Sequence, residues 1–291
     1  MDVVCQTRCQ IMKKTWQKWL PKLVGQALNT AGLFAPRKTV EWSMKVFAKP
    51  RKGRVLSHQK KFLQKAIPSS INVNGQDFHI HIFGQGSEAI LLAHGWESNS
   101  WRWRKLMRYL GTEKYQFIAL DAPGHGMTPS TLFNVKEYAE AIAAAAIEYK
   151  CCTVIGHSIG GFACLYAAAQ NTQAGITKIV SLAAPSSLQL IMEKYFSIIG
   201  LSQYMRSKTF DLFPKLYGQT IESLDIQNFG RNIAATGLII HDRMDGINGP
   251  ESAYQIHECW PESKLEITVD SDHSLQSDSV FERIRTFILE Q

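Results

Sequence analysis

A serine flanked by glycines is the residue in this sequence best suited to act as a nucleophile. Ser158 stands at the centre of Gly-His-Ser-Ile-Gly, residues 156–160, directly after an apolar run and before a stretch with helical spacing. A sharp turn from a strand into a helix holds such a serine in a strained backbone conformation, and glycines two residues away leave room where side chains would clash. The pattern predicts a nucleophile elbow at Ser158 rather than an ordinary strand–helix turn.

A serine hydroxyl is a poor nucleophile at neutral pH and needs a general base, which in turn needs an orienting acid. We expect His273 to be that base and Asp245 to be that acid. Each follows a predicted strand, residues 265–269 for His273 and 237–241 for Asp245. Because the carboxyl ends of parallel strands meet at one edge of a sheet, both side chains should lie on the edge that carries the serine. The chain order serine, aspartate, histidine agrees with this arrangement.

Other carboxylates and histidines compete for these two roles. Some carboxylates share a loop with the expected acid or the expected base, and some histidines end a predicted strand or fall within a predicted helix. The competing acids are Asp242, Asp270 and Asp272, and the competing bases are His241 and His257. We favour Asp245 and His273 over them.

Acyl transfer also needs two backbone N–H donors that stabilise the oxyanion. Ile159 follows the nucleophile and supplies one. The other is expected from residues 94–96, where Gly95 permits the turn and the N–H of Trp96 is our choice. The Trp96 ring is then expected to wall the acyl pocket, with a core tryptophan as the alternative. Three further histidines are expected to fix loops by hydrogen bonds: His94, His125 and His157.

The elements that must position these residues follow an alternating pattern. A β-hairpin is predicted around Asn74 and Gly75, because apolar residues there recur with period two. Apolar runs then alternate with helical stretches, which indicates a parallel sheet covered on both faces. The strands are predicted over residues 89–93, 117–120, 153–155, 179–183, 237–241 and 265–269, and the helices over 101–110, 135–149, 159–170, 251–258 and 280–289.

Residues 186–235 interrupt this alternation. The segment lacks a strand signal and is rich in aromatic and helical residues, so we predict a mostly helical cap inserted into a catalytic domain of residues 68–185 and 236–291. Phe196 and Phe213 are expected to contact the substrate from this cap.

Residues 1–67 form a separate basic unit in this prediction. They contain 15 lysines and arginines but only two acids, Asp2 and Glu41, in a chain of net charge +7. An amphipathic helix is predicted over residues 16–31, with Pro21 as a candidate kink, and a second over residues 40–47. Ala-Pro-Arg-Lys at 35–38 is expected to end the first helix.

Two interpretations of the first helix compete. Its apolar face either packs on the same protein, which we favour, or lies in a membrane interface with Lys13, Lys14, Lys18 and Lys22 near anionic headgroups. Basic charge also suits nucleic acid, but no recognised motif accompanies it, so no nucleic-acid partner is expected.

The composition is that of a globular protein, with 45% hydrophobic and 20% charged residues. No apolar run is long enough to span a membrane, and the N-terminus lacks the pattern of a signal peptide. The six cysteines have no regular spacing, so neither a disulfide framework nor a metal site is expected. We therefore expect a cytoplasmic protein, with membrane association as the alternative.

Successive motifs over about residues 70–291 resemble those of the α/β-hydrolase superfamily. These motifs are Leu-Ala-His-Gly-Trp at 92–96, Asp-Ala-Pro-Gly-His-Gly at 121–126, Gly-His-Ser-Ile-Gly-Gly at 156–161, His-Asp-Arg-Met-Asp at 241–245 and Asp-His at 272–273. The resemblance implies the α/β-hydrolase fold with a helical cap, and Ser158, Asp245 and His273 as a triad. Ser271 and Asp272 depart from the glycine that many members carry before the histidine.

The resemblance also narrows the chemistry. Members similar to haloalkane dehalogenases and epoxide hydrolases use an aspartate nucleophile, which Ser158 argues against. The loops typical of iminopeptidases and of carbon–carbon bond hydrolases are absent after His94. We predict a carboxylic ester hydrolase that works through an acyl-enzyme on a small-molecule ester and needs no cofactor. The alternatives are a thioesterase or acyltransferase with the same triad, and a non-catalytic binding protein.

Overall fold

The structure is a computed structural model in which residues 19–290 are described. The described residues divide into two compact units, one of residues 19–47 and Leu188–Ser223, the other of Ala48–Ser187 and residues 224–290. The first unit thus joins part of the expected N-terminal extension to most of the expected cap. The second contains the whole sheet.

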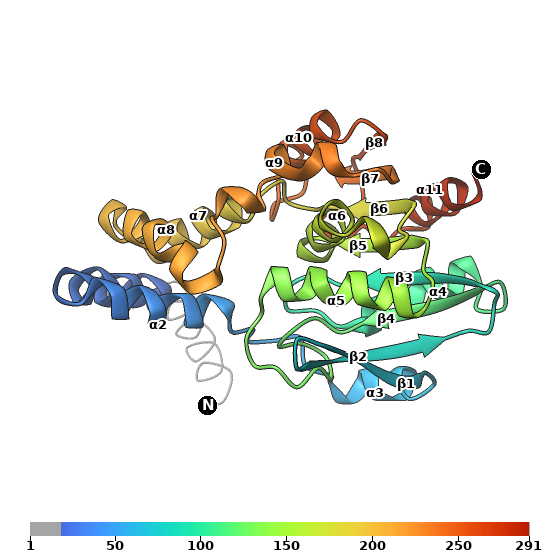
Figure 1. The fold of residues 1–291 in the computed structure, drawn as a ribbon, viewed down its shortest axis with the longest axis horizontal. Coiled ribbons are helices and arrows are strands. Elements are labelled where there is room, and N and C mark those ends of the chain that lie inside the picture. Colours follow the sequence, from blue (N-terminus) through green and yellow to red (C-terminus); the bar gives the residue numbers. More distant parts are fainter. Residues whose placement is uncertain (1–18, 291) are drawn as a thin grey trace, which may run out of the picture. The chain divides into compact units, whose positions relative to one another are not determined.

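The second unit is built on a sheet of eight strands in the order β1-β2-β4-β3-β5-β6-β7-β8 (Figure 1). The first two strands are antiparallel to their neighbours, and β3 to β8 run parallel. The strands are β1 (Ile67–Val73), β2 (Gln76–Phe83), β3 (Glu88–Ala93), β4 (Tyr115–Leu120), β5 (Thr153–His157), β6 (Lys178–Leu182), β7 (Thr236–Asp242) and β8 (Ser263–Thr268). The predicted hairpin and all six predicted parallel strands are present, and the mostly parallel sheet is confirmed.

Helices cover both faces of this sheet, as the apolar strands predict. On one face α4 (Arg104–Leu110) and α11 (Asp278–Leu289) pack against each other and on the strands, where Trp103, Leu106 and Ile284 join one buried cluster with residues of β3 to β7. On the other face α5 (Val135–Glu148) and α6 (Ile159–Gln170) lie side by side (Figure 1). Beside β7 and β8 lies α10 (Glu251–Cys259).

The first unit consists of helices that pack through small residues. A helix of residues 19–34 is followed by α2 (Pro36–Ala48), and the inserted segment forms α7 (Leu188–Ile199) and α8 (Gln203–Tyr217). A Cβ added at Gly25 would stand 1.7 Å from the Ile199 carbonyl oxygen, and one at Gly32 would stand 2.0 Å from Met205 Sδ. Asn29 bonds the turn between α7 and α8, donating to Gly200 O at 3.0 Å and accepting from Ser202 N at 2.8 Å. The N-terminal helix therefore packs against the inserted helices through the face of Gly25 and Gly32, whereas Trp19, Leu23, Ala27 and Ala31 of the predicted apolar face are exposed.

Two predicted helices begin at other residues than expected, and one short helix is additional. The first helix ends before Ala35 as expected, but the second helix begins at Pro36 rather than at residue 40, because proline has a suitable φ and needs no hydrogen-bond partner in a first turn. The helix predicted over residues 101–110 begins as a 3-10 turn, Ser100–Trp103, capped by the Asn99 side chain, before α4 starts. The short helix α3 (Ser57–Leu63) was not predicted.

Candidate active site

Ser158 occupies the turn between β5 and α6 in a conformation that few residues adopt. Its φ is 54° and its ψ is −127°. Small neighbours are required here, because a Cβ at Gly156 would stand 2.6 Å from Gly160 O and one at Gly160 would stand 2.4 Å from the Ala93 carbonyl oxygen. The strained elbow expected from the glycine spacing is therefore present, and Ser158 lies at the carboxyl end of a central strand.

Asp245 and His273 meet as their positions after β7 and β8 suggest. Asp245 Oδ2 lies 2.7 Å from His273 Nδ1. The Asp245 carboxylate is buried and the His273 side chain is 16% exposed. With Nδ1 facing the carboxylate, the second ring nitrogen, Nε2, is the one available to act as a base.

Several hydrogen-bond donors hold the Asp245 carboxylate in place. Its Oδ1 accepts from the backbone N–H groups of Ile247 and Asn248, at 2.8 and 2.9 Å, and His241 Nε2 lies 3.3 Å from its Oδ2. Burial alone would raise the pKa of Asp245, but the hydrogen bonds from His241, His273 and Asn248 outweigh it and hold this pKa far below its usual range. Asp245 therefore stays ionised at every working pH.

The competing groups have other partners. Asp242 accepts from Thr268 Oγ1 at 2.7 Å and from Ser271 N at 2.8 Å, so it joins the two loops rather than bonding the histidine. His257 lies in α10 and bonds Ser263 Oγ at 2.8 Å. Of the two competing histidines, His241 lies next to the Asp245 carboxylate, and its Nε2 also donates to Asn248 O at 2.7 Å.

Two buried side chains face the loop that contains His273: His157, which the sequence predicts to fix a loop by a hydrogen bond, and Arg102, for which the sequence predicts no role. The Nε2 of His157 donates to the carbonyl oxygen of His273 at 2.8 Å. Arg102 donates from Nη2 to Ser274 O at 2.9 Å and lies over the Trp103 ring. Burial and the nearby charge of Arg104 lower the pKa of Arg102 to about 9. A buried arginine cannot be recognised from sequence, because the apolar spacing around it predicts only a helix.

The loop after β3 approaches the nucleophile closely. A Cβ on Gly95 would stand 3.0 Å from Ser158 Cβ, so the backbone of residues 95–96 adjoins the candidate nucleophile. Ile159 begins α6, where the first N–H groups have no partner within the helix. The Trp96 ring is exposed rather than in the core, and it packs edge-on against His125 and Phe133.

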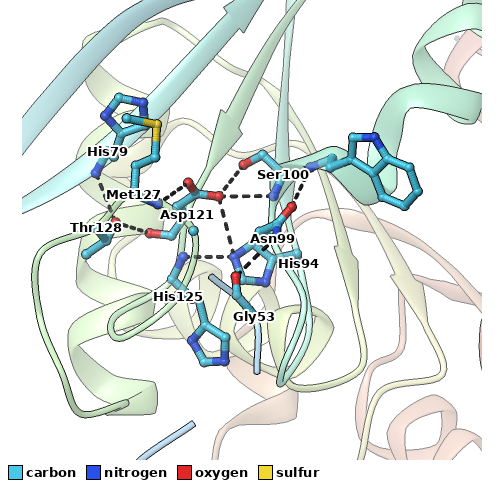
Figure 2. Close-up of polar contacts among 12 residues, drawn as sticks. Gly53, His79, His94, Asn99, Ser100, Asp121, His125, Met127 and Thr128 are labelled. Carbon is cyan, nitrogen blue, oxygen red and sulfur yellow. Dashed lines mark hydrogen bonds and ion pairs between the residues drawn. The ribbon is translucent and has the colours of Figure 1, made fainter. Parts of the chain in front are cut away.

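Asp121, which is fully buried, connects the loop after β3 to the loop after β4 (Figure 2). Asp121 accepts from Ser100 Oγ at 2.6 Å, Ser100 N at 3.0 Å and Met127 N at 2.9 Å, and His81 Nε2 lies 3.2 Å away. Burial would raise the pKa of Asp121, but His81, His94 and Ser100 hold it far below its usual range. Asp121 therefore has a structural role, because it holds the loops after β3 and β4 together.

The expected loop-fixing histidines make the bonds that this role requires. His94 Nε2 accepts from Ala122 N at 3.0 Å, and His125 Nε2 accepts from Glu97 N at 2.9 Å. Both histidines are buried, and burial lowers the pKa of each; for His125 the pKa falls to about 3. They stay neutral at physiological pH and serve as fixed acceptors.

A cavity of about 860 Å³ opens beside His273, within the second unit. Its walls include His157, Ile247 and Trp101, and the basic residues Arg51, Lys52 and Arg102. The predicted substrate contacts Phe196 and Phe213 belong to the first unit, where both side chains are buried.

Similar proteins agree with the fold and with the sequence motifs. Residues 88–207 match the family model described as the alpha/beta hydrolase fold. An esterase from Pyrococcus furiosus is similar in structure, with a TM-score of 0.62, 19% identity, and coverage of 82% of this chain and 97% of that one. An esterase from Rhodococcus gives a TM-score of 0.55 at 18% identity, covering 77% of this chain and 98% of that one. The chain has the α/β-hydrolase fold, and its resemblance to that superfamily is confirmed.

The curated relatives match a smaller part of this chain. A petunia protein named karrikin insensitive 2 receptor B is 24% identical over 173 residues, 53% of this chain and 62% of that protein. A pimeloyl-[acyl-carrier protein] methyl ester esterase from Legionella pneumophila is 42% identical over 53 residues, 18% of this chain and 21% of that enzyme. The matched parts span less than two thirds of either relative.

Proposed function

We propose that this protein hydrolyses carboxylic esters through an acyl-enzyme on Ser158. The observation that carries the proposal is the 2.7 Å contact between Asp245 and His273, at the same sheet edge as a serine held at φ 54°. A carboxylate that fixes Nδ1–H leaves Nε2 as the base that a serine nucleophile requires. Several similar proteins are esterases by name, which supports the same chemistry.

The proposed reaction has two halves. Ser158 Oγ attacks the acyl carbon as its proton passes to His273, and the N–H groups of Trp96 and Ile159 stabilise the oxyanion. His273 then gives the proton to the leaving alcohol. Water attacks the acyl-enzyme, His273 takes a proton from the water and returns it to Ser158, and the carboxylic acid leaves. Asp245 remains ionised throughout, because its hydrogen bonds hold its pKa so low.

A series of p-nitrophenyl esters from acetate to decanoate tests this proposal. The wild type should turn over part of the series, and Ser158→Ala should lose that turnover while it keeps the wild-type thermal stability. Ser69→Ala, a variant on β1, serves as the matched control. Turnover that survives in Ser158→Ala, or its absence from the wild type on every ester, would contradict the proposal.

Two alternatives use the same site and have a specific observation in their favour. A thioesterase or acyltransferase is favoured by the likeness to the thioesterase domain from the curacin biosynthetic pathway, at a TM-score of 0.54. Acyl thioesters, and competing alcohols or amines offered during ester turnover, separate these from an esterase. A ligand-binding protein without turnover is favoured by the petunia receptor. Binding of ester analogues that raises thermal stability, without product release, would favour that alternative.

A further inference from the structure

The helix of residues 19–34 is apolar on two opposite faces. One face consists of Gly25, Leu28 and Gly32, which recur every three or four residues and are buried. This is the face that approaches Ile199 and Met205 of the inserted helices. The packing within the first unit therefore buries one face of this helix and leaves the opposite face exposed.

The opposite face exposes large apolar side chains. Trp19, Leu23, Ala27, Ala31 and Phe34 follow one another at intervals of three or four residues, and all are exposed. Trp19 is 61%, Leu23 60% and Phe34 85% exposed. Single apolar residues are common on protein surfaces, but a stripe along a whole helix marks a binding surface. We call these five residues the outer stripe.

Basic side chains accompany the outer stripe. Lys22 precedes Leu23 by one residue, and its ammonium lies 5.9 Å from the Trp19 ring centre. In α2, directly after this helix, Lys38 and Lys45 are exposed, whereas the one acid of residues 19–48, Glu41, is paired with Arg37 at 3.0 Å. Tryptophan and leucine next to exposed lysines form the composition of helices that lie in a membrane interface.

We propose that the outer stripe rests on an anionic membrane surface. The helix would lie in the plane of the bilayer, with Trp19, Leu23 and Phe34 at the boundary between headgroups and acyl chains. Lys22, Lys38 and Lys45 would contact the anionic headgroups. Among residues 19–290, no helix is long and apolar enough to cross a membrane. The proposed contact is peripheral, and it does not depend on the chemistry at Ser158.

The basic side chains favour an anionic membrane over a second copy of the chain as the partner of the outer stripe. Two copies that met through the outer stripe would bring Lys22, Lys38 and Lys45 of each together, and like charges at an interface weaken association. An anionic bilayer pairs with the same charges. Each lysine near an anionic surface strengthens attachment about fivefold, and this attraction is screened over about 10 Å at 0.1 M salt.

Co-sedimentation of the full chain with vesicles tests the proposal. We expect binding to phosphatidylcholine vesicles that contain about one third phosphatidylglycerol, much weaker binding to phosphatidylcholine alone, and steep loss of binding between 0.05 and 0.5 M salt. Lys22→Gln with Lys38→Gln should weaken binding to the anionic vesicles more than tenfold. Leu23→Gln with Phe34→Gln should weaken binding at every salt concentration, because apolar burial is not screened.

A matched control keeps this test interpretable. Ile147→Gln with Leu289→Gln removes two side chains of comparable exposure from the second unit, and it should leave vesicle binding unchanged. Thermal unfolding of every variant should match the wild type, because each changed side chain is exposed. Absence of vesicle binding by the wild type, or equal binding by the Leu23 and Phe34 double variant, would overturn the proposal. A wild-type dimer that this double variant converts to a monomer would also overturn it, since the stripe would then hold a second copy.

Discussion

The ring of His157 donates from Nε2 to the carbonyl oxygen of His273 at 2.8 Å, and the two rings lie 4.9 Å apart at their centres. The residue before the candidate nucleophile therefore bonds the backbone of the candidate base. The loops after β5 and β8 are tied by this bond as well as by the side chains expected to react. Their relative position is set by the fold before substrate binds.

Substitutions of the two neighbouring carboxylates, Asp245 and Asp242, should have very different effects on ester turnover. Asp245→Asn is expected to reduce ester turnover by about 10⁴-fold, because an amide can fix the wrong tautomer of His273. Asp242→Asn should reduce turnover far less and lower thermal stability more, because Asp242 accepts bonds from Thr268 and Ser271. Steady-state rates and melting temperatures of both variants check this. Reversed effects would assign the acid role to Asp242.

Arg102 is expected to act as a positioning residue for the histidine loop. Arg102→Met removes the bond to Ser274 O and should lower kcat with little change in KM, and Arg102→Lys should restore part of the loss. Arg108→Gln, on the exposed side of α4, is the control and should leave both constants unchanged. Equal loss in the Met and Lys variants, accompanied by a lowered melting temperature, would indicate a purely structural arginine.

The fold should be less stable in acid because of its buried histidines. Burial lowers the pKa of His157, and burial with the charge of His94 lowers that of His125 to about 3. The unfolded chain binds protons at these rings near pH 6.5, whereas the native state does not. Stability is therefore full above pH 7 and falls between pH 6.5 and about 3, by up to about 1.4 kcal/mol per pH unit for each histidine.

Urea unfolding at pH 5, 6 and 7 measures this dependence. His125→Gln should lower the stability at pH 7 and make its decline with acid shallower than in the wild type. Phe281→Leu, a buried change without a titrating group, should lower stability equally at each pH. Identical pH slopes in the wild type and His125→Gln would show that His125 is protonated in the native state.

The close approach at Gly25 should make the first unit sensitive to one methyl group. Gly25→Ala places a Cβ 1.7 Å from the Ile199 carbonyl oxygen, so the helix of residues 19–34 must move away from α7. Overpacking of this kind costs about 1–3 kcal/mol. Limited proteolysis and thermal unfolding should show the loss. Gln26→Ala, the exposed neighbour in the same helix, is the control, and equal stability of the two variants would contradict the observed packing.

Much of the second unit could be predicted because its signals are local. Strands that are buried on both faces appear in the sequence as apolar runs, and the glycines around Ser158 predict the nucleophile elbow directly. The partners of Arg102 and Asp121 could not be predicted, because bonds to Ser274 O and to Ser100 depend on loops that meet across the sheet. The two faces of the helix of residues 19–34 share one spacing pattern, so the sequence predicts an amphipathic helix but not the partner of each face.

The most direct test of the central claim is mass spectrometry of the protein after reaction with a fluorophosphonate. The reagent phosphonylates a serine only when a base activates it, so it reports the nucleophile without any assumption about the substrate. We predict one adduct, on the peptide that contains Ser158, and its loss in His273→Gln and in Ser158→Ala. An unlabelled wild type, or an adduct on a different serine, would contradict the account.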